Sequence, residues 1–500
     1  MTAERAPNRL LVGGSWLMAG QAFDRVFGLA SIAVLARLLT PADFGVVAVA
    51  GTVVAAVELL TAFGFDWALI RHRELSADSL NTAWTLRVLL GLLTFIALCL
   101  LGPPAGSFYH LPSLKLVLPA LGLASFLGSL ENIGTVYFRR EFAFHKEFLL
   151  RAVSKLSGFL VTVPIALSYR TYWALVAGMV ALRLSGTLAS YALHPFRPRL
   201  SLIDARQLLS FSSWLLIGNI VDYFRERFSD LYLARVFGPR ANGLFSVAGE
   251  LSRVPISEVA APINRVAYSK YSEDLRTGRG VAGSYIEISS LIWMISLPMC
   301  AGTAAVATEA VALLLGPRWQ DAEAVLRLLA LGTAFTVMTA NTHYVYWVAG
   351  HSRAVAAISA AGAAIMVPVT ILCAHFAGYK GVAMAYVLTS AALVPVNFAT
   401  LRRLAGVGFA ALWVRVWRVA VAAIVMFITL TVAFPRPSRE TALVAAALLL
   451  TKVVIGASVY ALTAAALWTT CGRPEGPEQR ALQLAAQWGR RAIAKRDSQF

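Results

Sequence analysis

Residues 15–51 read SWLMAGQAFDRVFGLASIAVLARLLTPADFGVVAVAG, and this stretch indicates both the kind of fold and its internal order. It contains two long apolar segments with a break between residues 38 and 43. An apolar helix of about 20 residues is long enough to cross the roughly 30 Å hydrocarbon layer of a bilayer. The stretch therefore predicts a pair of membrane-spanning helices joined by a short connection.

The same pattern returns 198 residues later, at 213–249, as SWLLIGNIVDYFRERFSDLYLARVFGPRANGLFSVAG. Fourteen of the 37 aligned positions are identical. They include uncommon coincidences: Trp16 with Trp214, Asp24 with Asp222, Arg37 with Arg235, Pro41 with Pro239, and Gly45 with Gly243. A shared bias toward Ala, Leu and Val does not produce this set, so we interpret it as an internal repeat. An even number of predicted spans separates the two copies, which predicts two six-helix halves of the same orientation, related by an axis along the membrane normal.

Composition extends this interpretation to the whole chain. Of 500 residues, 58% are hydrophobic and only 14% are charged, and the mean hydropathy is +0.68. The apolar runs are continuous, so an all-α helical bundle is favoured over a membrane β-barrel. We predict about fourteen spans, near 11–38, 43–66, 81–101, 115–137, 151–168, 173–193, 208–236, 243–263, 282–305, 322–347, 354–376, 381–400, 419–434 and 441–468.

The predicted organisation is an N-lobe at 1–207, a C-lobe at 208–400, two extra helices at 401–470 and a basic tail at 471–500. The formal net charge is +18, and most of the Lys and Arg residues lie in alternate connections and in the tail. This bias places both termini in the cytoplasm and favours contact with anionic lipid headgroups rather than nucleic acid. The tail near 479–496 suits either a short helix on the membrane surface or a solvated basic tail, and the first span is expected to remain as an anchor.

Motifs for enzyme chemistry are missing from the sequence. It has no HExxH, GxxxxGK[ST] or GxSxG pattern, so metal hydrolysis, nucleotide-driven pumping and acyl transfer have no support. Its four cysteines form neither a CxxC motif nor a disulfide framework. We predict no enzyme activity and no cofactor.

Ionisable residues inside predicted spans are the candidate functional residues, because such groups are costly in lipid and normally face the bundle interior or water. They cluster in the repeated helices and their neighbours: Asp24, Arg25, Arg183, Asp222, Arg225, Glu226, Arg227, Asp230, Glu250 and Arg253. In one interpretation the arginines hold an anionic ligand while the carboxylates balance them or carry protons. In the other, residues spaced i, i+3, such as Asp222 with Arg225 and Glu250 with Arg253, form structural ion pairs.

Other intramembrane polar residues are assigned differently. Arg87, Glu131, Lys155 and Arg327 lie near predicted span ends, where snorkelling to the headgroups is expected. Lys452 is a weaker functional candidate, and His343 is expected to be a structural histidine.

The chain resembles the polysaccharide transporters of the multidrug/oligosaccharidyl-lipid/polysaccharide (MOP) exporter superfamily, in particular the Wzx-type flippases. The resemblance covers about residues 10–400. It rests on four segments: LARLLTPADFG at 35–45, YFRREFAFHKEF at 137–148, LARVFGPRANGLFSVAGELSRVP at 233–255, and LLGPRWQDAEAVLRLLALG at 314–332.

This resemblance implies a multi-pass protein of the bacterial inner membrane that flips undecaprenyl-diphosphate-linked oligosaccharide units to the periplasmic leaflet by alternating access. The polysaccharide polymerase and export machinery would be its partners, and a proton or sodium gradient would reset it. Span depth and repeat position, rather than a family motif, lead us to assign Arg25, Arg225, Arg227, Arg253 and Arg183 to substrate contact. Asp24, Asp222, Glu226 and Glu250 are assigned to coupling or gating on the same grounds.

Three alternatives remain open at this stage. A drug or cation antiporter shares the fold class, but its cavity normally selects cations with acidic and aromatic groups. A lipid II flippase of the MurJ type has a substrate with the same lipid diphosphate. A polymerase, ligase or glycosyltransferase would need a sizeable outer loop with catalytic residues, whereas the longest predicted outer loop, at 102–114, has no acidic residue.

Overall fold

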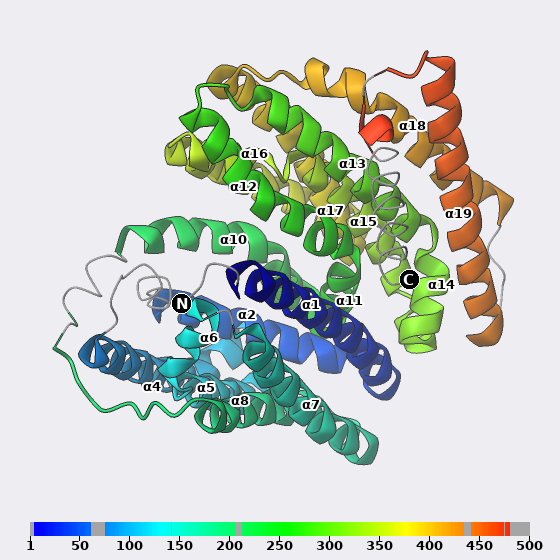
Figure 1. Ribbon diagram of the computed structural model, residues 1–500. Helices are drawn as coiled ribbons and strands as arrows, with labels where there is room; N and C mark the ends of the chain where they lie inside the picture. The colour runs from blue at the N-terminus through cyan, green and yellow to red at the C-terminus, as the bar shows by residue number, and fades with distance from the viewer. Residues whose placement is uncertain are drawn as a thin grey trace, which may run out of the picture. The chain divides into compact units, whose positions relative to one another are not determined.

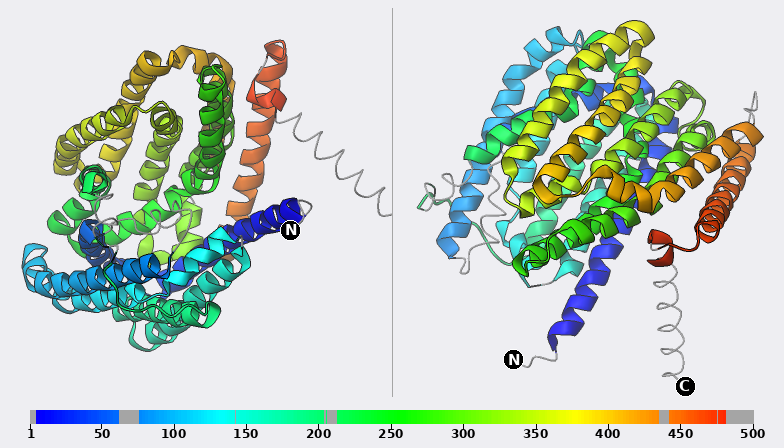
Figure 2. Two further views of the ribbon diagram at one scale, coloured as in Figure 1. Left: turned by 60° about the vertical axis from the view of Figure 1, so that its left-hand side comes forward. Right: turned by 90° about the horizontal axis from the view of Figure 1, so that it is seen from above.

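The computed structural model describes residues 5–61, 76–141, 143–203, 205, 213–434, 442–474 and 476–480. In these ranges the chain is nearly all helical and contains no β-strand (Figure 1, Figure 2). The predicted all-α fold class is confirmed. The chain divides into two compact units, residues 1–246 and 247–500. The predicted boundaries of the lobes at 207 and 400 stay predictions.

Most of the helices are long and apolar. The first unit contains α1 (Arg5–Leu38), α2 (Pro41–Thr61), α4 (Ala77–Phe108), α5 (Leu114–Ser129), α6 (Val136–Arg140), α7 (Phe144–Tyr169), α8 (Trp173–Leu193) and α10 (Ser213–Val236). Helix α11 (Gly238–Ser252) crosses the boundary. The second unit continues with α12 (Ala261–Arg276), α13 (Ala282–Ala305), α14 (Ala307–Ala310), α15 (Ala322–Thr339), α16 (Thr342–Val348), α17 (Ser352–Ala405), α18 (Phe409–Ala433) and α19 (Ala442–Thr470).

Ten helices among the described residues are long and apolar enough to cross a membrane, or eleven if the bent α5–α6 pair is one span. The predicted number of fourteen therefore stays a prediction. One long helix, α17, contains a break at Gly378, whose φ of 60° and ψ of −145° are not helical. This break falls between the predicted spans at 354–376 and 381–400. A positive φ of this kind is readily adopted by glycine, which has no Cβ.

In the first unit α7 packs along α8, and α4 packs along α5. The α7–α8 contact is close because both helices present small residues. A Cβ on Gly178 would lie 1.7 Å from Thr162 Oγ1, and one on Gly158 would lie 3.0 Å from the Gly178 carbonyl oxygen. Small residues at such positions let helix backbones approach, which is how helices associate in lipid without a hydrophobic driving force. Helix α1 lies on α7, and α2 contacts α10.

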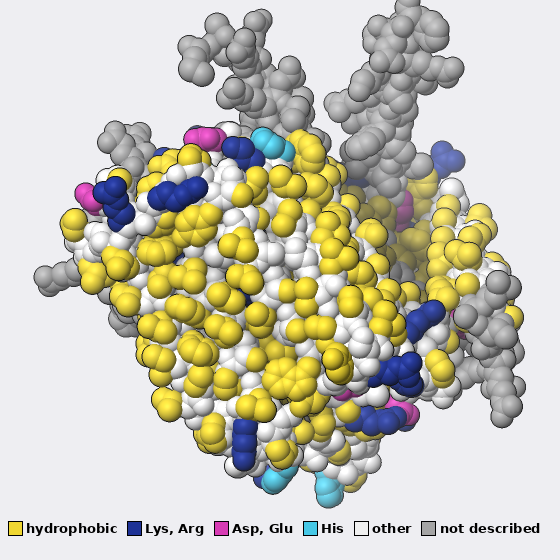
Figure 3. Space-filling model, turned by 90° about the horizontal axis from the view of Figure 1, so that it is seen from below, with side chains coloured by type: hydrophobic (Ala, Val, Ile, Leu, Met, Phe, Trp, Pro, Cys, Tyr) yellow, Lys and Arg dark blue, Asp and Glu magenta, His cyan; other side chains and the backbone are white. Residues whose placement is uncertain are grey.

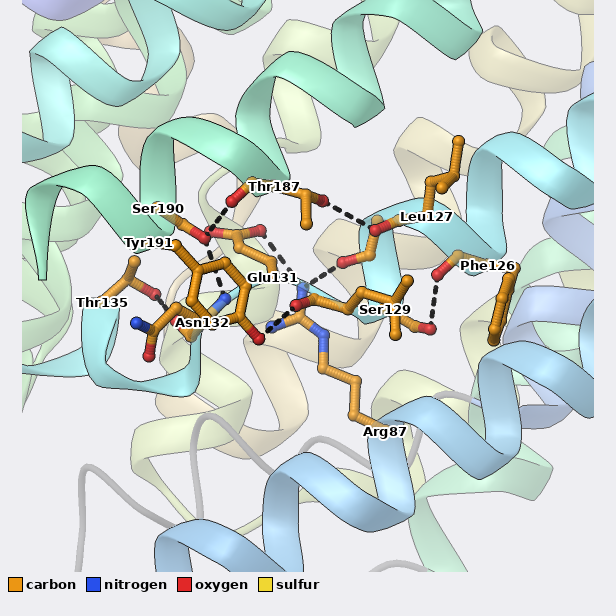
Figure 4. A network of polar contacts seen from close by, with 12 residues as sticks. Arg87, Phe126, Leu127, Ser129, Glu131, Asn132, Thr135, Thr187, Ser190 and Tyr191 are labelled. Atoms are coloured by element: carbon orange, nitrogen blue, oxygen red, sulfur yellow. Dashed lines mark hydrogen bonds and ion pairs between the residues drawn. The ribbon is translucent and has the colours of Figure 1, made fainter. Parts of the chain in front are cut away.

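The predicted span at 115–137 is broken. Helix α5 ends at Ser129, and the chain turns by 63° before it continues through Ile133–Arg140. Polar side chains satisfy the backbone groups that the break leaves open (Figure 4). Thr187 of α8 donates to the Leu127 carbonyl at 2.7 Å, and Tyr191 donates to that of Leu130 at 3.0 Å. Such compensation is what allows a helix to break at membrane depth.

The core of the second unit is aromatic. Trp293, Tyr271, Tyr285 and Tyr346 are each at most 1% exposed and lie in one hydrophobic cluster. Helix α13 packs against α15 and α18, and α15 packs along α17. The predicted connection after residue 263 is helical instead, because α12 runs to Arg276.

The outer surface of the protein is apolar. Exposed aliphatic side chains follow one side of α4: Leu89, Leu92, Leu93, Ile96 and Leu100. Figure 3 shows a face covered chiefly by hydrophobic side chains, with Lys and Arg mostly toward its edges. Exposure of such an apolar surface to water is unfavourable, whereas its exposure to the hydrocarbon of a bilayer is not. The structure thus supports a multi-pass membrane protein.

Candidate functional site

A line of alternating charges joins α7 to α1 and α6. Glu147, Arg151 and Lys155 are spaced by four residues and therefore share one face of α7. Asp24 of α1 reaches this face, where its carboxylate lies 2.8 Å from Lys155 Nζ and 3.4 Å from Arg151 Nη1. Glu147 contacts Arg151 and accepts from Arg139 Nη2 at 2.9 Å. We call these five residues the charge ladder.

Two neighbouring cavities of the first unit share Lys155 and Leu182 in their walls. The larger, of about 540 Å³, is mostly apolar and is called the apolar cavity. Its walls include Phe27, Phe159 and Met179, and its charged groups are Lys155, Arg227 and Asp230. Lys155 is therefore the charged group at the junction of the two spaces.

The smaller cavity, of about 360 Å³, is called the basic cavity. Its charged lining consists of Arg87, Arg139, Arg151, Lys155, Glu131 and Glu147. Four cations against two carboxylates leave an excess of positive charge, even though each carboxylate is paired. Arginine and lysine in such a setting bind phosphate and other anions.

Arg87 is held in place from α5 and the break that follows it. Its Nη2 donates to the Gly128 carbonyl at 3.2 Å and lies 3.3 Å from Glu131 Oε2 (Figure 4). Both side chains are about 30% exposed. Snorkelling predicts that these two side chains extend outward to the headgroups. They instead form an ion pair at a cavity wall.

His194, the residue after α8, lies near the basic cavity. The ring of His194 lies 5.9 Å from that of Phe138, which lines the basic cavity. Burial and then the positive charges of Lys146 and Arg197 lower the pKa of His194 from its ordinary value. A neutral imidazole is thus favoured here, and its Nδ1 accepts from the Phe196 N–H at 3.1 Å.

The predicted site residues of α10 lie in short-range contacts. Arg227 lines the apolar cavity and pairs with Asp230 at 3.3 Å. Arg225 lies 3.6 Å from Glu226, whose side chain is 62% exposed. The side chain of Asp222 lies outside the described residues.

The remaining predicted site residues occupy different surroundings. Arg25 of α1 is half-buried. Arg183 of α8 is exposed, and its side chain lies over Gly128 of α5. Glu250 and Arg253 are exposed in the second unit, and no ion pair joins them in the described part of the chain. The structure thus places Asp24 in the charge ladder and Arg227 in the adjoining cavity.

Arg151 and Lys155 were not predicted as site residues, because the predicted span began at 151. Helix α7 begins at Phe144, so Lys155 lies about 16 Å along it. The spacing of Glu147, Arg151 and Lys155 on one helical face is the sequence signal that identifies them. No group of three or more metal-ligating side chains exists among the residues that the structure describes.

Comparison with solved structures defines the class of protein. The structure titled "Lipid II flippase MurJ, inward closed conformation" matches 91% of this chain and 99% of its own, with a TM-score of 0.72 and 12% identity. An inward-facing multidrug resistance MATE family transporter of the MOP superfamily matches 77% of this chain and 94% of its own, with a TM-score of 0.59 and 16% identity. This protein therefore has the helical membrane fold that these transporters share.

Sequence comparison then gives the family. Residues 34–324 match the model of the family described as "Polysaccharide biosynthesis protein", and the chain belongs to that family. The resemblance predicted from the sequence is confirmed.

The relatives include the lipopolysaccharide biosynthesis protein WzxC of Escherichia coli (strain K12), 25% identical over 65% of this chain and 66% of its own. The succinoglycan biosynthesis transport protein ExoT of Rhizobium meliloti (strain 1021) is 24% identical over 61% of this chain and 63% of its own. The match thus spans slightly less than two thirds of the length of these relatives.

Proposed function

We propose that this protein flips undecaprenyl-diphosphate-linked oligosaccharides from the cytoplasmic to the periplasmic leaflet of a bacterial inner membrane, for polysaccharide assembly. Family membership, the succinoglycan transport relative and the flippase-like fold support a transporter in such a pathway. The observation that carries the proposal is the junction at Lys155. A basic cavity adjoins an apolar one there, as an amphiphile with an anionic centre requires.

The charge ladder suggests how the anion is received. Asp24 occupies the position between Arg151 and Lys155 that a phosphate oxygen would take. An arriving diphosphate displaces this carboxylate and gains charge-assisted hydrogen bonds from both cations. Because substrate and carboxylate compete for the same partners, binding is linked to movement of α1 against α7.

Arg25, Arg183, Arg225, Arg227 and Arg253 are proposed to contact the diphosphate or the sugars as the path opens. Asp24, Asp222, Glu226 and Glu250 are proposed to couple or gate the cycle, driven by a proton or sodium gradient. Intramembrane carboxylates are the usual carriers of such coupling ions. The polymerase and export machinery are the proposed partners that receive the flipped unit.

A lipid II flippase is the second candidate, because the MurJ structure is matched over 99% of its length. A cation antiporter fits less well, since the basic cavity has more cationic than acidic side chains. No bond-making step is proposed.

The test is to delete the gene in its host and follow the lipid-linked intermediate in each leaflet, with wild-type or variant copies restored. We expect a complete intermediate to accumulate facing the cytoplasm. Lys155→Met should lower flipping by at least about tenfold, since a charged hydrogen bond contributes about 1.5–3 kcal/mol. Lys380→Met, at an exposed position of α17, is the matched control and should restore normal flipping.

Other outcomes have defined meanings. An intermediate that reaches the periplasm unpolymerised in the deletion strain would mean that the protein acts after translocation. Accumulation of lipid II in place of the polysaccharide intermediate would select the second candidate.

A further inference from the structure

Two glycines, one from each copy of the sequence repeat, sit at a crossing of α2 and α11. A Cβ on Gly45 would lie 1.7 Å from the Pro239 carbonyl oxygen, and one on Gly243 would lie 1.8 Å from the Pro41 carbonyl oxygen. No side chain fits at such distances, so backbone contacts backbone at both points. These four residues belong to the first compact unit.

The contact is reciprocal. The shift of 198 residues that relates the repeats carries Pro41 to Pro239 and Gly45 to Gly243. In each copy the glycine follows the proline by four residues and shares its helical face. The glycine of each copy thus contacts the proline carbonyl of the other copy. The crossing therefore has the self-complementary form of a two-fold interface.

The α2 side of the crossing is rigidly mounted. Asp43 accepts from the Thr40 N–H at 2.9 Å and from its hydroxyl at 2.6 Å, which caps the start of α2. The other oxygen of Asp43 accepts from the Tyr172 N–H at 3.0 Å, next to the start of α8. Helix α2 therefore presents Gly45 as part of a fixed bundle.

The α11 side carries a buried polar group that the contact does not satisfy. Asn242 lies beside Gly243 and is 0% exposed, and neither its Nδ2 nor its Oδ1 has a hydrogen-bond partner. An unsatisfied buried amide costs free energy, and water removes that cost once the site opens. The crossing is close-packed through its glycines and weakened by its asparagine.

We propose that the α2–α11 crossing is a gate that opens and closes at one end of the transport path, and that it is closed in this structure. Gly45 and Gly243 permit closure, while Asn242 keeps the closed state from being too stable to open. An interface that can adopt two discrete packed arrangements is the usual basis of such transitions. The inference rests on the proposed transport function and, with both termini in the cytoplasm, assigns the gate to the periplasmic end.

A cysteine reporter at Ala241 tests the gate. Ala241 lies between Pro239 and Gly243 and is 6% exposed. The four native cysteines are first replaced by alanine, and labelling of Ala241→Cys by a membrane-impermeant maleimide is timed in whole cells. Gly45→Ala should raise the labelling rate about tenfold, because an added Cβ opposes closure, and Asn242→Leu should lower it about tenfold, because the closed state loses its unsatisfied amide.

Gly249→Ala is the matched control. Gly249 lies on the same helix as Gly243, and a Cβ there meets no atom within 4 Å, so labelling should stay within about twofold of the parent. If Gly45→Ala does not accumulate in the membrane, Asn242→Leu carries the test alone. Unchanged labelling in Asn242→Leu would overturn the gate.

Labelling needs no substrate, which separates the two proposals. A labelling response together with normal lipid-linked intermediates in the deletion strain would overturn the transport function and retain the gate. If the intermediate is arrested at the cytoplasmic face and the labelling rate of Ala241→Cys is unchanged by Asn242→Leu, only the gate would be overturned.

Discussion

Lys452 of α19 and Glu309 of α14 form a buried ion pair in the second unit, with side chains 6% and 1% exposed. The ammonium also lies 5.8 Å from the centre of the Phe434 ring. The second carboxylate oxygen of Glu309 is buried without a hydrogen-bond partner. Two desolvated charges therefore depend on each other, and their role here is to join α19 to the rest of the unit.

Removing one partner of this pair should destabilise the protein strongly. Glu309→Gln or Lys452→Met leaves one buried charge without its partner, which costs about 3–5 kcal/mol. The double variant Glu309→Gln with Lys452→Met should regain most of that loss. The measurement is the thermal unfolding midpoint in detergent for the two single variants and the double variant.

A second ion pair supplies the control for this cycle. Glu323 and Arg327 are half-buried and lie one turn apart on α15, so Glu323→Gln should cost less than about 1 kcal/mol. Equal effects of Glu309→Gln and Glu323→Gln would mean that the Lys452 pair has no special structural role.

At the scale of elements, hydropathy located most of the long helices but not their breaks or depths. Predicted spans at 173–193 and 282–305 coincide with α8 and α13. The start of α7 was placed seven residues late, because the charged segment 144–151 looks like a loop to any hydropathy window. Those charges are satisfied across the fold, by Asp24 and Arg139, and contacts of that kind are invisible in a local window.

The break after α5 depends on one fully buried side chain, Asn132. Its amide donates to the carbonyls of Phe196 at 2.8 Å and His194 at 3.3 Å, and its Oδ1 accepts from the Gly134 N–H at 2.9 Å. Asn132→Leu should therefore lower the free energy of unfolding by about 2–4 kcal/mol, since several buried partners lose their hydrogen bonds.

Thermal unfolding in detergent measures this effect, with Thr135→Val as the control. Thr135 makes one such bond, to the Asn132 carbonyl at 3.0 Å, so its replacement should cost about 1 kcal/mol or less. If both variants unfold alike, the bend is maintained by packing rather than by the asparagine.

At the scale of the whole molecule, the repeat was the most informative part of the sequence. The alignment of Pro41 with Pro239 and of Gly45 with Gly243 was found by comparing the sequence with itself. The structure brings these residues into mutual contact. The sequence could not reveal the cavities. The wall of the apolar cavity, for example, combines residues from six helices, whose packing is set by small residues such as Gly158 and Gly178. The positions of Asp24 and Arg227 deep in predicted spans were enough to identify them from the sequence. Identifying their neighbour Lys155 requires knowing where α7 begins.

The charge bias of the connections predicts the membrane orientation, and α4 offers a direct way to measure it. This helix has 32 residues, a length of about 48 Å, so its two ends lie on opposite sides of a hydrocarbon layer of about 30 Å. Ala77 and Ser107 are exposed at these ends. With the termini in the cytoplasm, Ala77→Cys faces the cytoplasm and Ser107→Cys the periplasm. In a background without native cysteines, an impermeant maleimide should therefore label Ser107→Cys in intact cells and Ala77→Cys only after permeabilisation.

The two variants control for each other, because they share one helix and differ only in the side of the membrane that they face. The reverse pattern would invert the protein and move the α2–α11 gate to the cytoplasmic end, since the α1–α2 connection lies on the same side of the membrane as Ser107.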